Sequence, residues 1–210
     1  MNIHINIALY PGDNLIANQL AQTNQHLNSM FGGQFTSVND LSTFTKWDTA
    51  TAAQSISTFD GNALSWDNDF IWSIYDAGVF KLTGPSMMLT IVGEVPVQYM
   101  PGDFGGSLYV PPQRDPGLYL LSQPVPALPY SNFTNIVGRL PREGEFVARL
   151  DGLTQMYTTN SFDGFSWSQG EPQLNVGEAA FFNLVEVPEP SSIAIICIGV
   201  VGLWCGRRRS

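Results

Sequence analysis

Residues 58–66 read TFDGNALSW, and residues 161–167 read SFDGFSW. Both stretches contain an aromatic residue, an Asp-Gly pair and a Ser-Trp pair in the same order. An Asp-Gly pair between two strand-like runs is typical of a β-hairpin, because glycine accepts the positive φ angle that such a turn requires. The two stretches therefore predict two similar hairpins, 103 positions apart.

The similarity extends to both sides of the hairpins. A Pro-Gly pair followed by LIANQ at residues 15–19 returns 105 positions later as Pro-Gly followed by LLSQ at residues 120–123. The run AGVFKL at residues 77–82 returns 102 positions later as AAFFNL at residues 179–184. Blocks that recur in the same order with slightly different spacing indicate a duplicated unit that has acquired small insertions and deletions in its loops.

This duplication predicts an all-β body built from two similar units of about 70 residues, arranged as a sandwich or a barrel. The first unit is expected at residues 6–82 and the second at residues 118–185. The connecting segment, residues 83–117, holds a strand-like run at residues 87–92. A low share of charged residues (13%) with abundant Gly and Pro favours short strands joined by turns over long helices.

Two further segments of the sequence each predict a single secondary-structure element. Residues 2–9 (NIHINIAL) alternate apolar and polar side chains, which is the period of a half-buried strand. The polar stretch at residues 18–29 predicts one short helix. Because a strand stands where the basic and apolar segments of an export signal would be, we expect a signal peptide upstream of Met1 that is missing from this chain. A non-functional orphan sequence is the alternative.

Charge and cysteine content exclude several functions for the body, residues 1–186. It contains 17 acidic and 6 basic residues, a net charge of about −11, and therefore repels the phosphate backbone of nucleic acids. Both cysteines, Cys197 and Cys205, lie beyond the body. The body thus has no thiol for a disulfide, a metal site or a catalytic nucleophile.

The C-terminal tail joins an apolar run to a basic end. Residues 191–206 read SSIAIICIGVVGLWCG without a charge, and Arg207, Arg208 and Arg209 follow directly. The run is at the short limit of a transmembrane helix, which needs about 17 to 25 apolar residues. By the positive-inside rule the arginines stay in the cytoplasm as a stop-transfer signal, which places the body on the opposite side of the membrane.

Pro188, Glu189 and Pro190 stand just before this run. Two prolines around one glutamate exclude a helix and a central strand, so the segment is extended and accessible to a processing enzyme. The triplet, the apolar run and the basic end together resemble the PEP-CTERM sorting signal, at residues 187–210. The resemblance implies that an exosortase, a membrane-embedded transpeptidase-like enzyme, recognises the triplet and removes the tail, which leaves the body secreted or on the cell surface. Extracellular polysaccharide is the second partner that the resemblance implies.

The body itself resembles the duplicated β-rich bodies of uncharacterised PEP-CTERM proteins. This resemblance rests on NLIANQL at residues 14–20, on the two Phe-Asp-Gly and Trp combinations, and on NVGEA at residues 175–179 before an aromatic pair. It implies a β-rich architecture and no known activity.

No catalytic residue, cofactor or zinc site is predicted in the body. His4 and His26 are the only histidines and lack the spacing of zinc ligands, and no serine-nucleophile motif is present. We therefore expect no enzymatic activity. Asp67 and Asp69 are the candidates for a calcium site, because calcium prefers oxygen ligands in flexible loops. Their alternative role is to hold the turn through local hydrogen bonds.

The tryptophans bear on a second function. Trp66 and Trp167 occupy equivalent positions of the two units, which favours a packing role. Together with Trp47 and Trp72 they could instead stack on sugar rings, so a carbohydrate-binding surface module is the alternative, and a secreted hydrolase is a less favoured one. The sequence thus predicts an exported, exosortase-sorted surface or extracellular-matrix protein without catalytic activity of its own.

Overall fold

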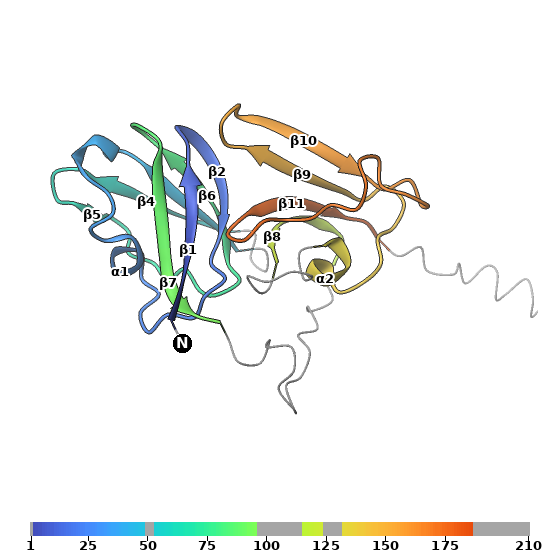
Figure 1. Ribbon diagram of the computed structural model, residues 1–210, viewed down its shortest axis with the longest axis horizontal. Coiled ribbons are helices and arrows are strands. Elements are labelled where there is room, and N and C mark those ends of the chain that lie inside the picture. Colours follow the sequence, from blue (N-terminus) through green and yellow to red (C-terminus); the bar gives the residue numbers. More distant parts are fainter. Residues whose placement is uncertain (1, 49–52, 96–114, 124–131, 187–210) are drawn as a thin grey trace, which may run out of the picture.

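The computed structural model describes residues 2–48, 53–95, 115–123 and 132–186 (Figure 1). These residues are mostly β-structure, with two short α-helices and one 3-10 turn. The strands are β1 (Asn2–Leu9), β2 (Gly12–Ala17), β3 (Thr43–Asp48), β4 (Ala53–Asp60), β5 (Ser65–Trp66), β6 (Ala77–Leu82), β7 (Met87–Glu94), β8 (Gly117–Ser122), β9 (Phe146–Asp151), β10 (Met156–Ser161) and β11 (Ala179–Leu184). The helices are α1 (Leu27–Phe31) and α2 (Phe133–Val137), and the 3-10 turn is Ser37–Asn39.

The strands form three antiparallel sheets. The first sheet has the order β2-β6-β3-β4-β5, the second has the order β8-β11-β9-β10, and β1 pairs with β7 in a third, two-stranded sheet. The first pair of strands also has the same register in the two larger sheets, since Gly12 lies opposite Leu82 and Gly117 lies opposite Leu184. The first, second, third and last strands of each sheet along the chain therefore occupy the same places, and β5 is an additional edge strand of the first sheet.

The N-terminal strand has the alternation that its sequence predicts. Ile5 and Leu9 of β1 are buried, whereas Asn2, His4 and Asn6 are exposed. Its partner β7 extends the run expected at residues 87–92 to Glu94. The two-stranded sheet packs against the core of the first sheet, because burial on one side of each strand leaves an apolar face to cover.

The helix predicted at residues 18–29 is wrong in its position. Helix α1 begins only at Leu27, near the end of this stretch, and Asn18 lies directly after β2, fully buried. The Asn18 side chain donates to the carbonyl oxygen of Trp72 (3.0 Å) and accepts from the Leu20 amide (3.1 Å). Such side-chain bonds to the backbone compete with helical hydrogen bonds, so the chain at Asn18 is not helical and the helix starts nine residues later.

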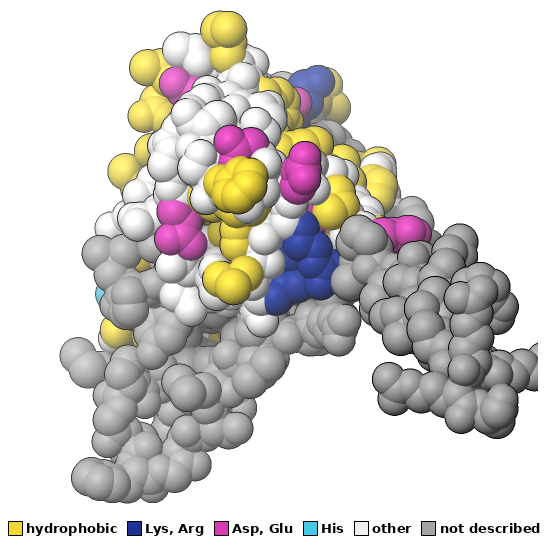
Figure 2. All heavy atoms as spheres, turned by 90° about the vertical axis from the view of Figure 1, so that its right-hand side faces the viewer, with side chains coloured by type: hydrophobic (Ala, Val, Ile, Leu, Met, Phe, Trp, Pro, Cys, Tyr) yellow, Lys and Arg dark blue, Asp and Glu magenta, His cyan; other side chains and the backbone are white. Residues whose placement is uncertain are grey.

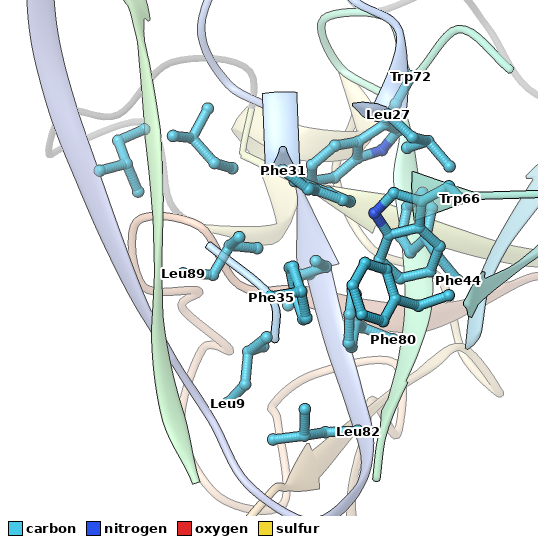
Figure 3. Packing of buried hydrophobic residues seen from close by; sticks show 14 of the residues in the cluster. Leu9, Leu27, Phe31, Phe35, Phe44, Trp66, Trp72, Phe80, Leu82 and Leu89 are labelled. Atoms are coloured by element: carbon cyan, nitrogen blue, oxygen red, sulfur yellow. The ribbon is translucent and has the colours of Figure 1, made fainter. Parts of the chain in front are cut away.

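An aromatic cluster forms the core of the first sheet (Figure 3). Phe31 of α1 lies at its centre, with its ring 5.4 Å from Trp72 and 5.8 Å from Phe44 and Trp66, mostly edge to face. Edge-to-face pairs add about 0.5–1.5 kcal/mol each beyond the burial of apolar area. A five-residue helix thus anchors the first half of the body through Phe31 and the equally buried Leu27.

The second sheet has its own core, and a third cluster joins the two sheets. Helix α2 packs Phe133 against Phe182 of β11, with ring centroids 5.8 Å apart. On the opposite face, Leu120 of the second sheet packs against Leu15 of the first. Buried Gln19 lies at this junction, where it donates to the carbonyl oxygen of Gln123 (3.1 Å) and accepts from the amide of Gly177 (2.8 Å).

Both predicted Asp-Gly turns are present. Asp60 accepts hydrogen bonds from the amides of Asn62 and Ala63, and Asp163 accepts them from Phe165 and Ser166. Glycine adopts the expected positive φ angle in only one of the two turns. Gly164 has a φ of +96°, whereas the positive φ of the first turn belongs to Leu64 (+53°).

Gly61 is needed for space instead. A Cβ atom at this position would lie 2.8 Å from Cβ of Asp40, whose carboxylate accepts a hydrogen bond from the Gly61 amide (2.7 Å). The two turns therefore use glycine for different physical reasons.

Candidate functional site

The residues predicted to form the sorting signal lie outside the described residues. This holds for Pro188, Glu189 and Pro190, for the expected transmembrane helix at residues 191–206, and for Arg207, Arg208 and Arg209. Among the residues that are described, no helix is long and apolar enough to cross a membrane. The site that the structure does describe is the end of β11, after which the chain continues into the signal.

Glu145 holds this end of the body. Its side chain is fully buried directly before β9, and Oε1 accepts a hydrogen bond from the amide of Val185 (3.1 Å), the residue after β11. Arg139 binds both carboxylate oxygens, and the amide of Arg142 donates to Oε2 (2.9 Å). Arg142 also reaches the carbonyl oxygen of Val185 from its Nη1 (3.4 Å). We call Glu145, Arg139 and Arg142 the exit clamp.

The electrostatics of the exit clamp favour the charged form of Glu145. Burial alone would raise the pKa of this carboxyl, because a charge is costly away from water. The hydrogen bonds from Arg139 and from the amides of Val185 and Arg142 outweigh burial and lower the pKa below its usual value. Glu145 is thus an anion that Arg139 neutralises.

The first sheet has a neutral counterpart of this contact. Ser42 lies directly before β3 and is fully buried, and Thr83 lies directly after β6. The amide of Thr83 donates to Oγ of Ser42 (3.0 Å), as the Val185 amide donates to Glu145. In the first sheet, a neutral hydroxyl accepts the hydrogen bond from the residue after the last strand, and the chain continues to β7. In the second sheet, a carboxylate paired with Arg139 accepts it, and the chain continues to residues 187–210.

Two exposed apolar side chains lie in the segments next to the exit clamp. Phe165 is 96% exposed and Leu140 is 74% exposed, the two largest exposed fractions among the large hydrophobic side chains of the described residues. Figure 2 faces this side of the molecule and shows hydrophobic side chains among acidic ones, with basic side chains beside them. Glu143 and Asp163 are exposed acidic residues of the same segments.

The second sheet also carries a polar pocket of about 530 Å³ over β9 and β10. Glu178 and Arg149 form a bidentate ion pair in its wall, with Nε and Nη2 of Arg149 2.6 and 2.8 Å from the carboxylate oxygens. The rest of the lining is mostly polar and includes Asn160, Gln169 and Gln173. Such a surface can offer hydrogen bonds to a polar ligand.

The tryptophans divide between core and surface. Trp72 is fully buried and Trp66 is nearly so, which confirms a packing role for these two. Trp167 is half-buried and packs on Phe133, with ring centroids 5.1 Å apart. Trp47 on β3 is 38% exposed. The equivalent tryptophans of the two hairpins therefore both pack on aromatic neighbours.

Both calcium candidates have protein partners. Asp67 accepts hydrogen bonds from the amide of Thr58 (2.8 Å) and from the hydroxyl of Ser57 (3.2 Å), and Asp69 accepts one from the amide of Asn28 (2.8 Å). Within the described ranges, no three His, Cys, Asp or Glu side chains come together as a metal site would require. These bonds assign both carboxylates a role in holding loops, and calcium binding stays a prediction.

One comparison with known proteins identifies the C-terminal segment. A protein-family model described as the PEP-CTERM protein-sorting motif matches residues 186–209. Neither the curated proteins nor the solved structures contain a significant match to this chain. The match spans the Pro-Glu-Pro triplet and all three arginines, so the chain carries a C-terminal sorting signal of the PEP-CTERM kind, which directs exported proteins to an exosortase.

Proposed function

We propose that this protein is an exported surface or extracellular-matrix protein that an exosortase processes at residues 188–190. The match of residues 186–209 to the sorting motif is the observation that carries the proposal. Pro188, Glu189 and Pro190 would be the recognised residues. The apolar run 191–206 would anchor the chain in the inner membrane before processing, and Arg207, Arg208 and Arg209 would stop its transfer.

Substitution in the triplet tests this function. We expect Glu189→Ala to leave the unprocessed chain in the inner-membrane fraction, whereas the wild-type body appears on the cell surface or in the medium. Glu94→Ala, at the exposed end of β7 and outside residues 186–209, serves as the control and should be processed normally. Equal distribution of the Glu189→Ala and wild-type bodies among the fractions would contradict the proposal.

We also propose that the two larger sheets are duplicated units, one within residues 6–82 and one within residues 118–185, joined by the segment 83–117. The shared strand order and register support the duplication. Ion pairs support it as well, because Lys46 with Asp76 on the first sheet has the same positions as Arg149 with Glu178 on the second. Duplication of a β-rich unit fits a structural or binding body, and we propose that the body has no catalytic activity.

Carbohydrate binding is the second candidate function of the body. The observation in its favour is the polar pocket over β9 and β10, whose amide and carboxylate side chains suit the hydroxyl groups of sugars. Calorimetric titration of the full chain with oligosaccharides from the host's extracellular polysaccharide tests it. Gln173→Ala in the pocket should weaken binding, and Gln54→Ala on exposed β4 should not. The absence of binding heat for the wild-type chain would contradict this candidate.

A further inference from the structure

We propose that the end of the body around the exit clamp is a docking face for the exosortase, with Phe165 and Leu140 as its apolar contacts. The inference rests on the proposed function, because it concerns the enzyme that processes the signal. It goes further in assigning a part of the folded body, outside residues 186–209, to recognition.

The first step is the short distance between the clamp and the signal. Glu145 binds the amide of Val185, and Arg142 binds its carbonyl oxygen. Only Glu186 and Val187 separate this residue from Pro188. A chain advances at most about 3.6 Å per residue, so Pro188 lies within about 11 Å of Val185 whatever path the chain takes.

The second step is that the clamp stays closed in the folded protein. Release of Val185 would remove an amide donor from the fully buried carboxylate of Glu145 and would break the contact of Arg142 with the Val185 carbonyl oxygen. Loss of a hydrogen bond by a buried charged group is costly, because water does not replace it. An enzyme that acts at the Pro-Glu-Pro triplet therefore meets the folded body at close range.

The third step identifies the surface within that range. A Cβ atom built on Gly144 would lie 3.8 Å from Cγ1 of Val185, and one built on Gly164 would lie 3.5 Å from Cβ of Glu143. The turn that carries Phe165 is thus next to the loop that leads into the clamp. Arg139 itself donates to the carbonyl oxygen of Leu140 (3.0 Å), which connects the second apolar side chain to the clamp.

Exposure and rigidity make Phe165 suited to binding. A large apolar side chain in water is unfavourable, and its burial in a partner recovers this free energy. Asp163 accepts hydrogen bonds from the amides of Phe165 and Ser166, so the turn is ordered before binding. A preordered contact loses little conformational entropy in a complex.

Charge favours a protein partner over lipid. Glu143, Asp163 and Glu186 are exposed, and Glu143 and Asp163 belong to the same loops as Leu140 and Phe165. Hydrogen bonds from Ser166 and Phe165 lower the pKa of Asp163, which keeps its carboxylate charged. An anionic lipid surface repels such a rim. The partner that fits is an apolar recess bordered by basic side chains on the outer face of the exosortase.

The test is the rate of processing in an exosortase-containing host, followed by pulse-chase. We expect the double substitution Phe165→Ser with Leu140→Ser to slow removal of the tail about tenfold, the loss typical of two contact residues at an interface. Leu153→Ser is the matched control, because Leu153 is 72% exposed but lies beyond the opposite end of β9. It should be processed like the wild type.

A spacer separates docking from general effects on folding. Eight Gly and Ser residues inserted between Glu186 and Val187 lengthen the tether by about 16 Å without touching the clamp. The insertion should slow processing, and the double substitution should then have little additional effect. A double substitution that slows both chains equally, or slows neither, would overturn the proposal.

A photo-cross-linker in place of Phe165 identifies the occupant. Adducts with the exosortase support the proposal, and adducts only with lipid or with a second copy of the chain overturn it. Failure of the proposed function looks different, since the wild-type tail would then be retained whether or not the exosortase is present.

Discussion

At the scale of single residues, the exit clamp contains a fully buried carboxylate that is paired with an arginine. A buried carboxylate is costly unless its oxygens are occupied, and Glu145 accepts hydrogen bonds from Arg139, from the Arg142 amide and from the Val185 amide. Ser42 makes the corresponding contact in the first sheet with a neutral hydroxyl. The two positions offer a matched pair for mutation.

Glu145→Ala should lower the free energy of unfolding by about 3 kcal/mol, because it leaves the guanidinium of Arg139 and two backbone amides without their acceptor. Ser42→Ala removes a neutral acceptor and should cost about 1 kcal/mol. Urea denaturation of both variants checks the difference. Equal losses would mean that the ion pair adds nothing to the hydrogen bond.

The same carboxylate should make stability depend on pH. Because the folded-state pKa of Glu145 is lowered, its contribution is present above pH 4.5, the ordinary value, and is lost as the pH falls through the folded pKa. Glu145→Gln should therefore lose less stability than the wild type when the pH is lowered from 5 to about 3. Melting curves of the two proteins across this range test the sign, and parallel curves would contradict it.

At the scale of elements, the hairpin turns illustrate where sequence reasoning succeeds and where it stops. Asp-Gly followed by Ser-Trp correctly predicts both turns, because the aspartate caps backbone amides locally. The need for Gly61 depends on Asp40, a residue 21 positions away, which no local pattern reveals. The position of α1 was also missed, because the long-range bond from Asn18 to Trp72 opposes helix formation there.

The two glycines should respond differently to alanine. Gly164→Ala should cost about 1 kcal/mol through its positive φ, independently of its neighbours. Gly61→Ala should cost more because of its contact with Asp40, and Asp40→Gly, which removes the clashing Cβ atom, should relieve part of that cost. A double-mutant cycle on urea unfolding measures this coupling. Additive effects of the Gly61 and Asp40 substitutions would contradict the steric explanation.

At the scale of the whole molecule, two sheets that share the order of four strands meet at a shared apolar cluster, and the chain leaves the second sheet through the exit clamp. The repeated blocks of sequence predict the all-β character and most strands. They do not predict the pairing of β1 with β7, since a single strand pattern does not specify its partner. The clamp was missed as well, because Glu145 is an ordinary acidic residue until the fold brings Arg139 and Val185 to it.

The sorting signal could be predicted almost completely, because its information is local. A Pro-Glu-Pro triplet, an apolar run and three arginines lie in consecutive order, and the match to residues 186–209 covers all of them. The role of the body has no such local signature. Its polar pocket and its docking face consist of side chains that only the folded sheets bring together.

The most direct test of the account is the intact mass of the body isolated from two isogenic strains, one with the exosortase and one without it. The account predicts a chain that ends before the apolar run 191–206 in the first strain and a chain that keeps its terminal arginines in the second. The same mass in both strains, with residues 191–210 retained, would contradict it.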